Sequence, residues 1–116
     1  MEMDITPLSQ GLMKVTLVGR LDSPGVDRIE TRFLASLVPA GHSAIIDLSQ
    51  VDFVASMGLR MLISAARSLR SRNASLAVYG AQRPVNEVFE QVSFGKVISV
   101  RATEAEALEA VALSAP

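Results

Sequence analysis

The chain alternates between short runs rich in β-branched residues and longer segments in which apolar residues recur at helical spacing. Short apolar runs bounded by turn residues indicate strands, and repeats of three and four residues indicate amphipathic helices. The resulting order is strand, strand, helix, strand, helix, strand, helix, strand, helix. Strands that alternate with helices pair in parallel through right-handed crossovers. The pattern predicts one α/β domain over residues 1–116, with a mixed, mostly parallel sheet of about five strands and about four helices.

The first strand is expected to be an antiparallel edge of the sheet. It is joined to the second strand by Ser9, Gln10 and Gly11, a short polar link typical of a hairpin. The third strand has apolar residues on both faces at its middle, which predicts a central position. The predicted strands cover residues 3–8, 13–19, 43–49, 75–80 and 96–100.

Each helical segment carries its own signal. In the first three segments the apolar residues follow the spacing of one helix face. The fourth, residues 103–113, opens with Thr-Glu-Ala-Glu, which is a capping-box pattern. The three apolar faces consist of Val26, Ile29, Phe33 and Leu37, of Leu59, Leu62, Ile63, Ala66 and Leu69, and of Val85, Val88, Phe89 and Val92.

The charge balance limits the partners of the domain. Eleven basic and twelve acidic residues leave a net charge of −1, whereas nucleic-acid binding requires clustered Lys and Arg. We therefore expect no nucleic-acid partner. The N-terminal segment lacks a basic region before an apolar run, so no signal peptide is expected. The apolar stretches fall short of the roughly 20 residues that a membrane-spanning helix needs, which predicts a cytoplasmic protein without membrane insertion.

The residue types also argue against an enzyme. The chain has no cysteine, which excludes disulfides, thiolate metal sites and thiol catalysis. Its one histidine, His42, precedes the third strand, at the end of the sheet opposite to the usual ligand-binding edge. The sequence contains neither an Asp-x-Asp ligand loop nor a glycine-rich phosphate loop, and no nucleophile is matched with a base. We expect no catalytic activity, no cofactor and no metal site.

Two loops follow strands at the edge where open α/β sheets meet ligands and partners. They are residues 19–24 and residues 48–59. The second loop brings Ser56 to the start of a helix, where free backbone N–H groups and a partial positive charge favour a phosphate, and Gly58 leaves the backbone accessible. Ser56 is thus a candidate site of reversible phosphorylation. Helix capping alone would also explain a serine at this position, and Gly58 would equally serve packing.

These residues resemble the STAS domain family, which includes anti-sigma factor antagonists and the tails of sulphate transporters. The run from Asp47 to Leu59, DLSQVDFVASMGL, is similar to the family's signature, and residues 19–22, GRLD, are similar to its Gly-x-Leu-Asp turn. The order of strands and helices also matches over essentially the whole chain. The resemblance implies a single STAS-like domain over residues 1–116.

The resemblance also implies a function in partner switching. In bacterial antagonists of this family, an anti-sigma factor that is also a serine kinase, a GHKL-type ATPase, phosphorylates the signature serine. The unmodified antagonist binds this kinase and frees the sigma factor, so that transcription is regulated indirectly, and a phosphatase resets the modified form. In this chain the phosphoacceptor corresponds to Ser56, the turn aspartate near it to Asp22, and the acid at the end of the central strand to Asp47.

The chain departs from the family pattern on both sides of the acceptor. Ala55 stands in place of an acid, and Met57 stands in place of a second hydroxyl. The departures leave Ser56 itself in place. They favour an alternative function, a constitutive STAS-like scaffold subunit of a transporter ATPase or a sensory complex, in which Ser56 only caps the helix.

Partner contacts are expected around the acceptor. A phosphate adds about −1.5 to −2 charges, and a dianion that faces acidic groups at an interface weakens binding. Asp22 and Asp52 would add to this repulsion if the two loops converge. Met57 would offer an adaptable apolar contact, and Arg60 is the first of four arginines that either form a solvated face or steer an acidic partner. The expected partner-binding residues are Asp22, Ser23, Asp52, Ala55, Met57, Gly58 and Arg60.

Overall fold

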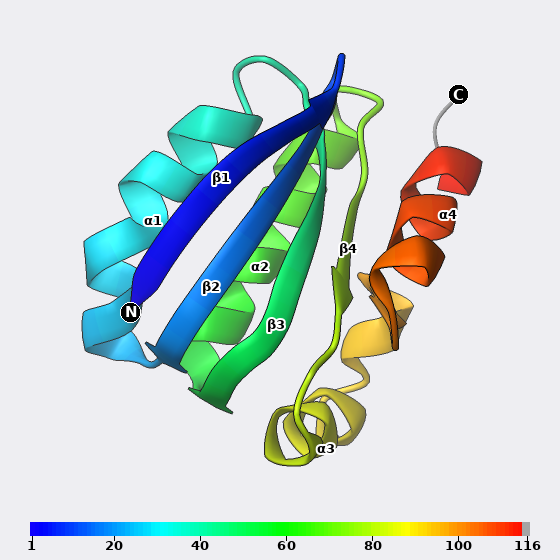
Figure 1. Cartoon of the computed structure of the whole chain (residues 1–116). Coiled ribbons are helices and arrows are strands. Elements are labelled where there is room, and N and C mark those ends of the chain that lie inside the picture. The colour runs from blue at the N-terminus through cyan, green and yellow to red at the C-terminus, as the bar shows by residue number, and fades with distance from the viewer. Residues whose placement is uncertain (115–116) are drawn as a thin grey trace.

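Strands and helices alternate along the chain in the predicted order (Figure 1). The computed structural model describes residues 1–114, so that residues 115–116 of the expected domain lie outside the described part. The elements are β1 (Glu2–Ser9), β2 (Leu12–Leu21), α1 (Ser23–Leu37), β3 (Ser43–Val54), α2 (Ser56–Arg70), β4 (Leu76–Tyr79), α3 (Arg83–Gln91), the 3-10 helix η1 (Phe94–Lys96), β5 (Ser99–Arg101) and α4 (Glu104–Ser114).

The five strands form one sheet in the order β1-β2-β3-β4-β5. β1 is antiparallel to β2 and lies at the edge, and each of the other neighbouring pairs is parallel. Gly11, in the turn between β1 and β2, has a φ of +78°, a backbone conformation that glycine adopts without strain. The predicted mixed sheet with an antiparallel edge strand is confirmed.

Helices cover the two faces of the sheet unequally. α1 and α2 lie together on one face, and α4 packs on the other over β3, β4 and β5 (Figure 1). Because successive strand residues point to opposite faces, Ile46 belongs to the larger core, whereas Ile45 faces α4. The larger core takes in buried residues of α1, α2, α3 and η1, and the smaller core consists of Ile45, Ala77, Tyr79, Ala107, Ala110 and Val111.

The helices bury the faces that their sequences predict, with small differences. The apolar face predicted for α1 is wholly buried. In α2 the buried face also takes in Met61 and Ala65, and two residues of the predicted face are half-buried. The predicted start of α4 is confirmed, because the hydroxyl oxygen of Thr103 accepts a hydrogen bond of 3.2 Å from the backbone N–H of Glu106.

Two predictions for the last third of the chain are wrong. α3 ends at Gln91, so Val92 lies beyond the helix and is 52% exposed instead of buried with the apolar face. The strand predicted at residues 96–100 is confined to Ser99–Arg101. The preceding residues form η1, in which Phe94 turns inward and stacks on Phe89 with 4.3 Å between the ring centroids.

β3 is longer than the sequence predicts. It continues past Ser49 to Val54, so that most of the expected loop is strand. Two register shifts against β2 insert extra residues into β3. At each of these bulges two successive residues are exposed, Ser49 with Gln50 and Asp52 with Phe53. The bulges re-aim the end of the strand toward solvent, and they also break the alternation of apolar and polar residues by which a strand is recognised.

Candidate partner-binding site

The two predicted loops converge where β2 ends and α2 begins. Leu21 and Val54 are partners in the parallel pairing of β2 with β3. The backbone N–H of Ala55 donates a hydrogen bond of 3.0 Å to the carbonyl oxygen of Leu21. The starts of α1 and α2 therefore lie side by side, just beyond the paired strand ends.

Ser56 is exposed and is the first residue of α2. The N-cap is Ala55, which has an extended backbone (φ −112°, ψ 175°) and makes no side-chain capping bond. Within the described residues, the Ser56 hydroxyl has no hydrogen-bond partner. The expectation that Ser56 caps α2 is therefore wrong, and its hydroxyl is not committed to the fold.

Gly58 fixes the orientation of this first helical turn. It is buried, and a Cβ atom in its place would lie 2.6 Å from Cγ and 2.7 Å from the carbonyl oxygen of Leu21. Only a residue without a side chain lets α2 approach β2 so closely. Ser56 is two residues away, on the opposite side of a helix with about 3.6 residues per turn. Gly58 is consequently a packing residue, buried away from the surface that a partner would touch, and its packing turns Ser56 outward.

Asp22 follows β2 as the N-cap of α1. Its Oδ1 accepts a hydrogen bond of 2.9 Å from the backbone N–H of Gly25, and its Oδ2 accepts one of 3.3 Å from Nε of Arg20. The Gly25 N–H, which contributes most, and the Arg20 guanidinium stabilise the carboxylate and lower the pKa of Asp22 below its usual value. The charge of Asp22 is thus already engaged within the chain.

Arg20 and Phe53 form an exposed pair at the same end of the sheet, where β2 and β3 finish. We call this end of the sheet the edge. The guanidinium carbon of Arg20 lies 4.2 Å from the centroid of the Phe53 ring, and the two residues are register partners in β2 and β3. Phe53 is 39% exposed. Its neighbour Asp52 is also exposed, and the Asp52 carboxylate has no partner among the described residues. The edge therefore presents a ring, a guanidinium and an acid next to Ser56, and only the acid is expected from the sequence.

The remaining expected contact residues differ in their exposure. Ser23, the first residue of α1, and Arg60, one turn into α2, are exposed. Ala55 is half-buried. Met57 is also half-buried and packs against the larger core, so it offers a partner only part of its surface.

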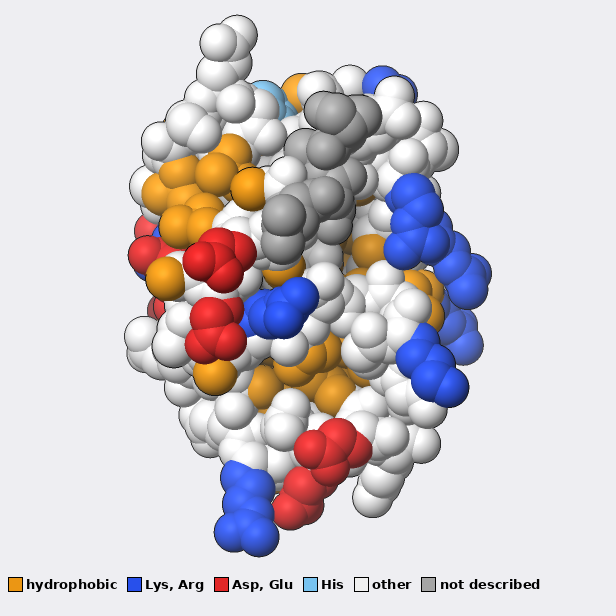
Figure 2. All heavy atoms as spheres, turned by 90° about the vertical axis from the view of Figure 1, so that its right-hand side faces the viewer, with side chains coloured by type: hydrophobic (Ala, Val, Ile, Leu, Met, Phe, Trp, Pro, Cys, Tyr) orange, Lys and Arg blue, Asp and Glu red, His pale blue; other side chains and the backbone are white. Residues whose placement is uncertain are grey.

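Positive charge follows the exposed side of α2. Figure 2 shows Lys and Arg side chains along the edge of the molecule on which α2 lies. Arg70 donates a hydrogen bond of 3.1 Å to the carbonyl oxygen of Val97. Neither Arg60 nor Arg67 has an acid or a carbonyl oxygen as a partner among the described residues. Most of the positive charge on this helix is therefore not neutralised within the chain.

Asp47 lies apart from this edge. It is seven residues before Val54, on the face of β3 that α4 covers. Its Oδ1 accepts hydrogen bonds from the N–H of Ser49 at 2.9 Å and from the hydroxyl of Ser49 at 2.7 Å. The fold does not bring Asp47 and Ser56 together.

A polar cluster that the sequence does not reveal joins α4 to the sheet. Oε1 of Glu104 lies 2.6 Å from Nζ of Lys14 and accepts a hydrogen bond of 3.1 Å from the hydroxyl of Tyr79. The contact lowers the pKa of Glu104 and raises that of Lys14. Burial, the nearby carboxylate of Asp47 and the contact with Glu104 raise the pKa of Tyr79 to about 12. These residues come from β2, β3, β4 and α4, so no local pattern predicts that they meet.

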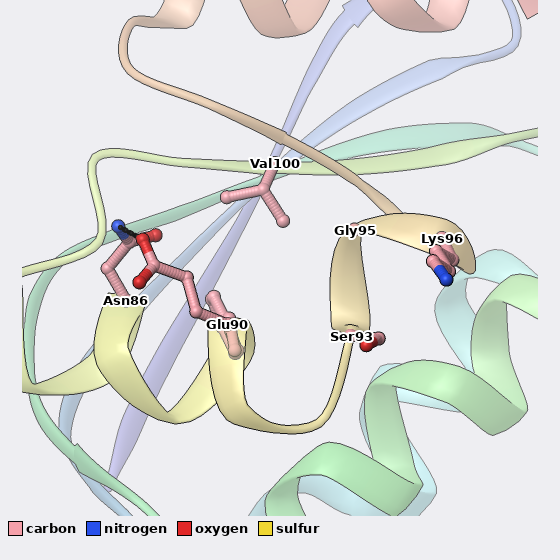
Figure 3. Close-up of a pocket in the computed structure, with 7 residues that line it drawn as sticks. Asn86, Glu90, Ser93, Gly95, Lys96 and Val100 are labelled. Atoms are coloured by element: carbon pink, nitrogen blue, oxygen red, sulfur yellow. Dashed lines mark hydrogen bonds between the residues drawn. The ribbon is translucent and has the colours of Figure 1, made fainter.

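Other surface features lie away from Ser56. A hollow of about 340 Å³ lies between α3, η1 and β5 (Figure 3). Asn86 and Glu90 line it from α3, joined by a hydrogen bond of 3.3 Å, and Val100 faces them from β5. The described residues contain no cluster of His, Asp or Glu side chains that would hold a metal ion. No helix in the described part of the chain is long and apolar enough to cross a membrane.

Known proteins are similar to this chain along most of its length. The profile of the STAS domain family matches residues 5–107. A Bordetella bronchiseptica protein described as an anti-sigma factor antagonist, BtrV, is 27% identical over 90 residues, which are 78% of each chain. The anti-sigma-B factor antagonist of Listeria monocytogenes is 25% identical over 92 residues, which are 79% of this chain and 81% of the relative.

The same fold occurs in solved structures of the anti-sigma factor antagonist SpoIIAA. Its unphosphorylated form is 20% identical, with a TM-score of 0.76 over 96% of each chain. The phosphorylated form, from Bacillus, is also 20% identical, with a TM-score of 0.71 over 95% of this chain and 99% of the other. The expected fold, with its antiparallel edge strand and four α-helices within residues 1–114, is thereby confirmed.

Proposed function

Since the chain belongs to the STAS domain family, we propose that it is an anti-sigma factor antagonist that binds an anti-sigma factor kinase and is released when Ser56 is phosphorylated. In this role it is a regulatory binding protein and not an enzyme, and it influences transcription indirectly through a sigma factor. The similar proteins from Bordetella and Listeria are described as anti-sigma factor antagonists.

The exposed hydroxyl of Ser56 is the observation that carries this proposal. It begins α2, has no hydrogen-bond partner among the described residues, and is turned outward by the packing of Gly58 on Leu21. In the proposed reaction the kinase transfers the γ-phosphoryl group of ATP to the serine oxygen. An O–P bond forms, ADP leaves, and the hydroxyl proton passes to a base of the kinase. The free N–H groups of the first helical turn then stabilise the phosphate.

The proposed switch acts through charge and needs no rearrangement of the fold. The phosphate adds about −1.5 to −2 charges four residues after Asp52, whose carboxylate is exposed and unpaired among the described residues. A kinase surface that closes over this edge must then bury the added negative charge. Each 1.4 kcal/mol of such a penalty lowers the affinity by about tenfold. A phosphatase that removes the group restores binding.

The two departures from the family pattern are compatible with this switch. The start of α2 is held by the hydrogen bond from Ala55 to Leu21 and by the packing of Gly58. Neither contact uses the side chain of residue 55 or of Met57. The missing acid and the missing second hydroxyl therefore leave the position of Ser56 unchanged.

Those departures are also the observation that favours the second candidate, a constitutive scaffold subunit of a transporter ATPase or a sensory complex. In that function Ser56 is not phosphorylated, and its only role is to cap the helix. Ala55 holds the cap position instead, which removes the structural reason for a serine at position 56 in this function. We therefore rank the phosphoswitch first.

Phosphorylation by the cognate kinase tests the proposal. The chain is incubated with ATP and a GHKL-type anti-sigma factor kinase that binds it, and the phosphate is located by mass spectrometry. Ser56→Ala is expected to abolish modification. Ser23→Ala is the matched control, because it removes another exposed serine at the first position of a helix, and it is expected to leave modification intact.

Release is measured on the same proteins by calorimetry. The phosphorylated chain is expected to lose affinity for the kinase. Modification confined to another residue, or none by an active kinase that binds the chain, would contradict the phosphoswitch. A stable complex with a transport ATPase or a sensor protein, unaffected by the residue at position 56, would support the scaffold.

A further inference from the structure

Arg60 lies one helical turn beyond Ser56 on the same exposed side of α2. Residues four apart in a helix are about 40° apart around the axis, with Cβ atoms about 5–6 Å apart. Helical side chains tilt toward the N-terminus of their helix. A long side chain at position 60 is therefore directed toward position 56, while Gly58, between the two, is buried on the opposite side.

The guanidinium of Arg60 is not engaged by the rest of the chain. No hydrogen bond or ion pair of Arg60 is present among the described residues, and the first turn of α2 contains no acid. Arg20, the other arginine of this edge, differs because it pairs with Asp22 at 3.3 Å and stacks on Phe53. Arg60 is thus the cation of this edge that can accept a new anionic partner without giving up an existing one.

We propose that Arg60 binds the phosphate of phosphorylated Ser56 within the same helix. This inference rests on the proposed phosphorylation of Ser56. A guanidinium presents five N–H donors in a planar fork that fits the oxygens of a phosphate. Phosphorylation then has two effects at the edge: it adds a dianion, and it engages the guanidinium that the unmodified protein presents to its partner.

A phosphoserine installed at position 56 during translation tests this contact without any kinase. The second ionisation of the phosphate is followed by phosphorus NMR as a function of pH at low ionic strength. Four proteins are compared: the parent, Arg60→Gln, Arg60→Lys and Arg67→Gln. Arg67 is the matched control, because it is exposed and unpaired among the described residues like Arg60 but lies about 16 Å from Ser56 along the helix axis.

Loss of Arg60 is expected to raise the pKa of the phosphate. A cation at hydrogen-bond distance favours the dianion, and a helical ion pair of this spacing corresponds to roughly 0.2–0.4 of a pKa unit. The phosphate of the Arg67→Gln protein is expected to have the same pKa as that of the parent. The pKa in Arg60→Lys is expected to lie between those of the parent and Arg60→Gln. The contact is refuted if Arg60→Gln titrates with the parent, or if Arg67→Gln shifts the phosphate as much as Arg60→Gln does.

The two proposals fail in different experiments. If no kinase modifies Ser56, or if modification does not release the kinase, the proposed function fails while the titration of the installed phosphate is unaffected. If the titration shows no specific effect of Arg60, the helical contact fails while kinase-dependent release still stands. Circular dichroism of the four proteins verifies that α2 is intact in each.

Discussion

The guanidinium of Arg20 lies between the carboxylate of Asp22 and the ring of Phe53. Its Nε is 3.3 Å from Oδ2 of Asp22, and its central carbon is 4.2 Å from the ring centroid. Since Asp22 also caps α1, these side chains connect a helix start, the end of β2 and the second bulge of β3. Stacking of a guanidinium on an aromatic ring stabilises both in one orientation. The pair is therefore an ordered contact surface beside Ser56.

Phe53 is expected to contribute to partner affinity more than to folding. Exposed aromatic and arginine side chains are the residues that most often dominate protein interfaces. We expect Phe53→Ala to lower the affinity for the anti-sigma factor kinase by about tenfold or more, measured by calorimetry. Val92→Ala is the control, because Val92 is even more exposed, at 52%, but follows α3 and is not part of this edge. An equal loss in both variants would show that the effect is not specific to the edge.

Ser56→Asp is expected to weaken kinase binding while the domain remains as stable as the parent. A carboxylate at the start of a helix is compatible with the helix dipole, and exposed substitutions usually change stability by less than about 0.5 kcal/mol. Binding is measured by calorimetry and stability by urea unfolding. A large loss of stability would mean that the serine hydroxyl supports the fold, contrary to its lack of partners within residues 1–114.

Gly58→Ala is expected to destabilise the domain. The added methyl group would lie 2.6 Å from Cγ and 2.7 Å from the carbonyl oxygen of Leu21, and the backbone oxygen cannot move without disturbing β2. Overpacking of this kind costs about 1–3 kcal/mol, which urea unfolding detects as a lower midpoint. Gly95→Ala is the control, because no atom outside the adjoining backbone and the two chain neighbours lies within 4 Å of the added methyl group. A midpoint unchanged by Gly58→Ala would contradict the close approach of α2 to β2.

The pKa of Tyr79 is expected to be higher in the folded protein than in the unfolded chain. Tyr79 is the single tyrosine and the chain has no tryptophan, so the absorbance of tyrosinate reports on this side chain alone. We expect a midpoint of about 12 in the folded protein and of about 10 in urea. Because the folded-state pKa is the higher one, the stability linked to this group is fully present below pH 10 and is lost as the pH rises toward 12.

Glu104→Gln provides the internal test of that titration. The contact with Glu104 is among the causes that raise the pKa of Tyr79, so the variant is expected to titrate at a lower pH than the parent. A folded-state midpoint close to that of the unfolded chain would contradict the packing of Tyr79 under α4.

Helix positions are predictable here because their signal is local. The apolar face of α1 repeats at one spacing over Val26, Ile29, Phe33 and Leu37, and all four are buried. The end of β3 is not predictable in the same way. Its bulges exist only in relation to the register of β2, and the outward pairs that they create resemble a polar loop.

The position of Ser56 is predicted correctly, but its relation to the helix is not. Serine is a favoured cap, which suggests a structural role for it. The cap falls on Ala55 because its backbone N–H is bonded to Leu21 and Gly58 packs on the same residue. These contacts join segments that are far apart in the sequence, as does the stacking of Arg20 on Phe53. Residue preferences alone therefore place the serine near the helix start, but they do not show whether its hydroxyl caps the helix or is free.

At the bulged end of β3, buried residues and exposed residues are close neighbours in the sequence. Val51 and Val54 are buried in the larger core, whereas Asp52 and Phe53 between them face solvent. Substitutions of Asp52 and Phe53 can alter the charge and shape of this surface while the buried core stays the same. If the domain binds a kinase as proposed, copies of it can differ in their partners through a few exposed residues at this end of β3 while they share one buried core.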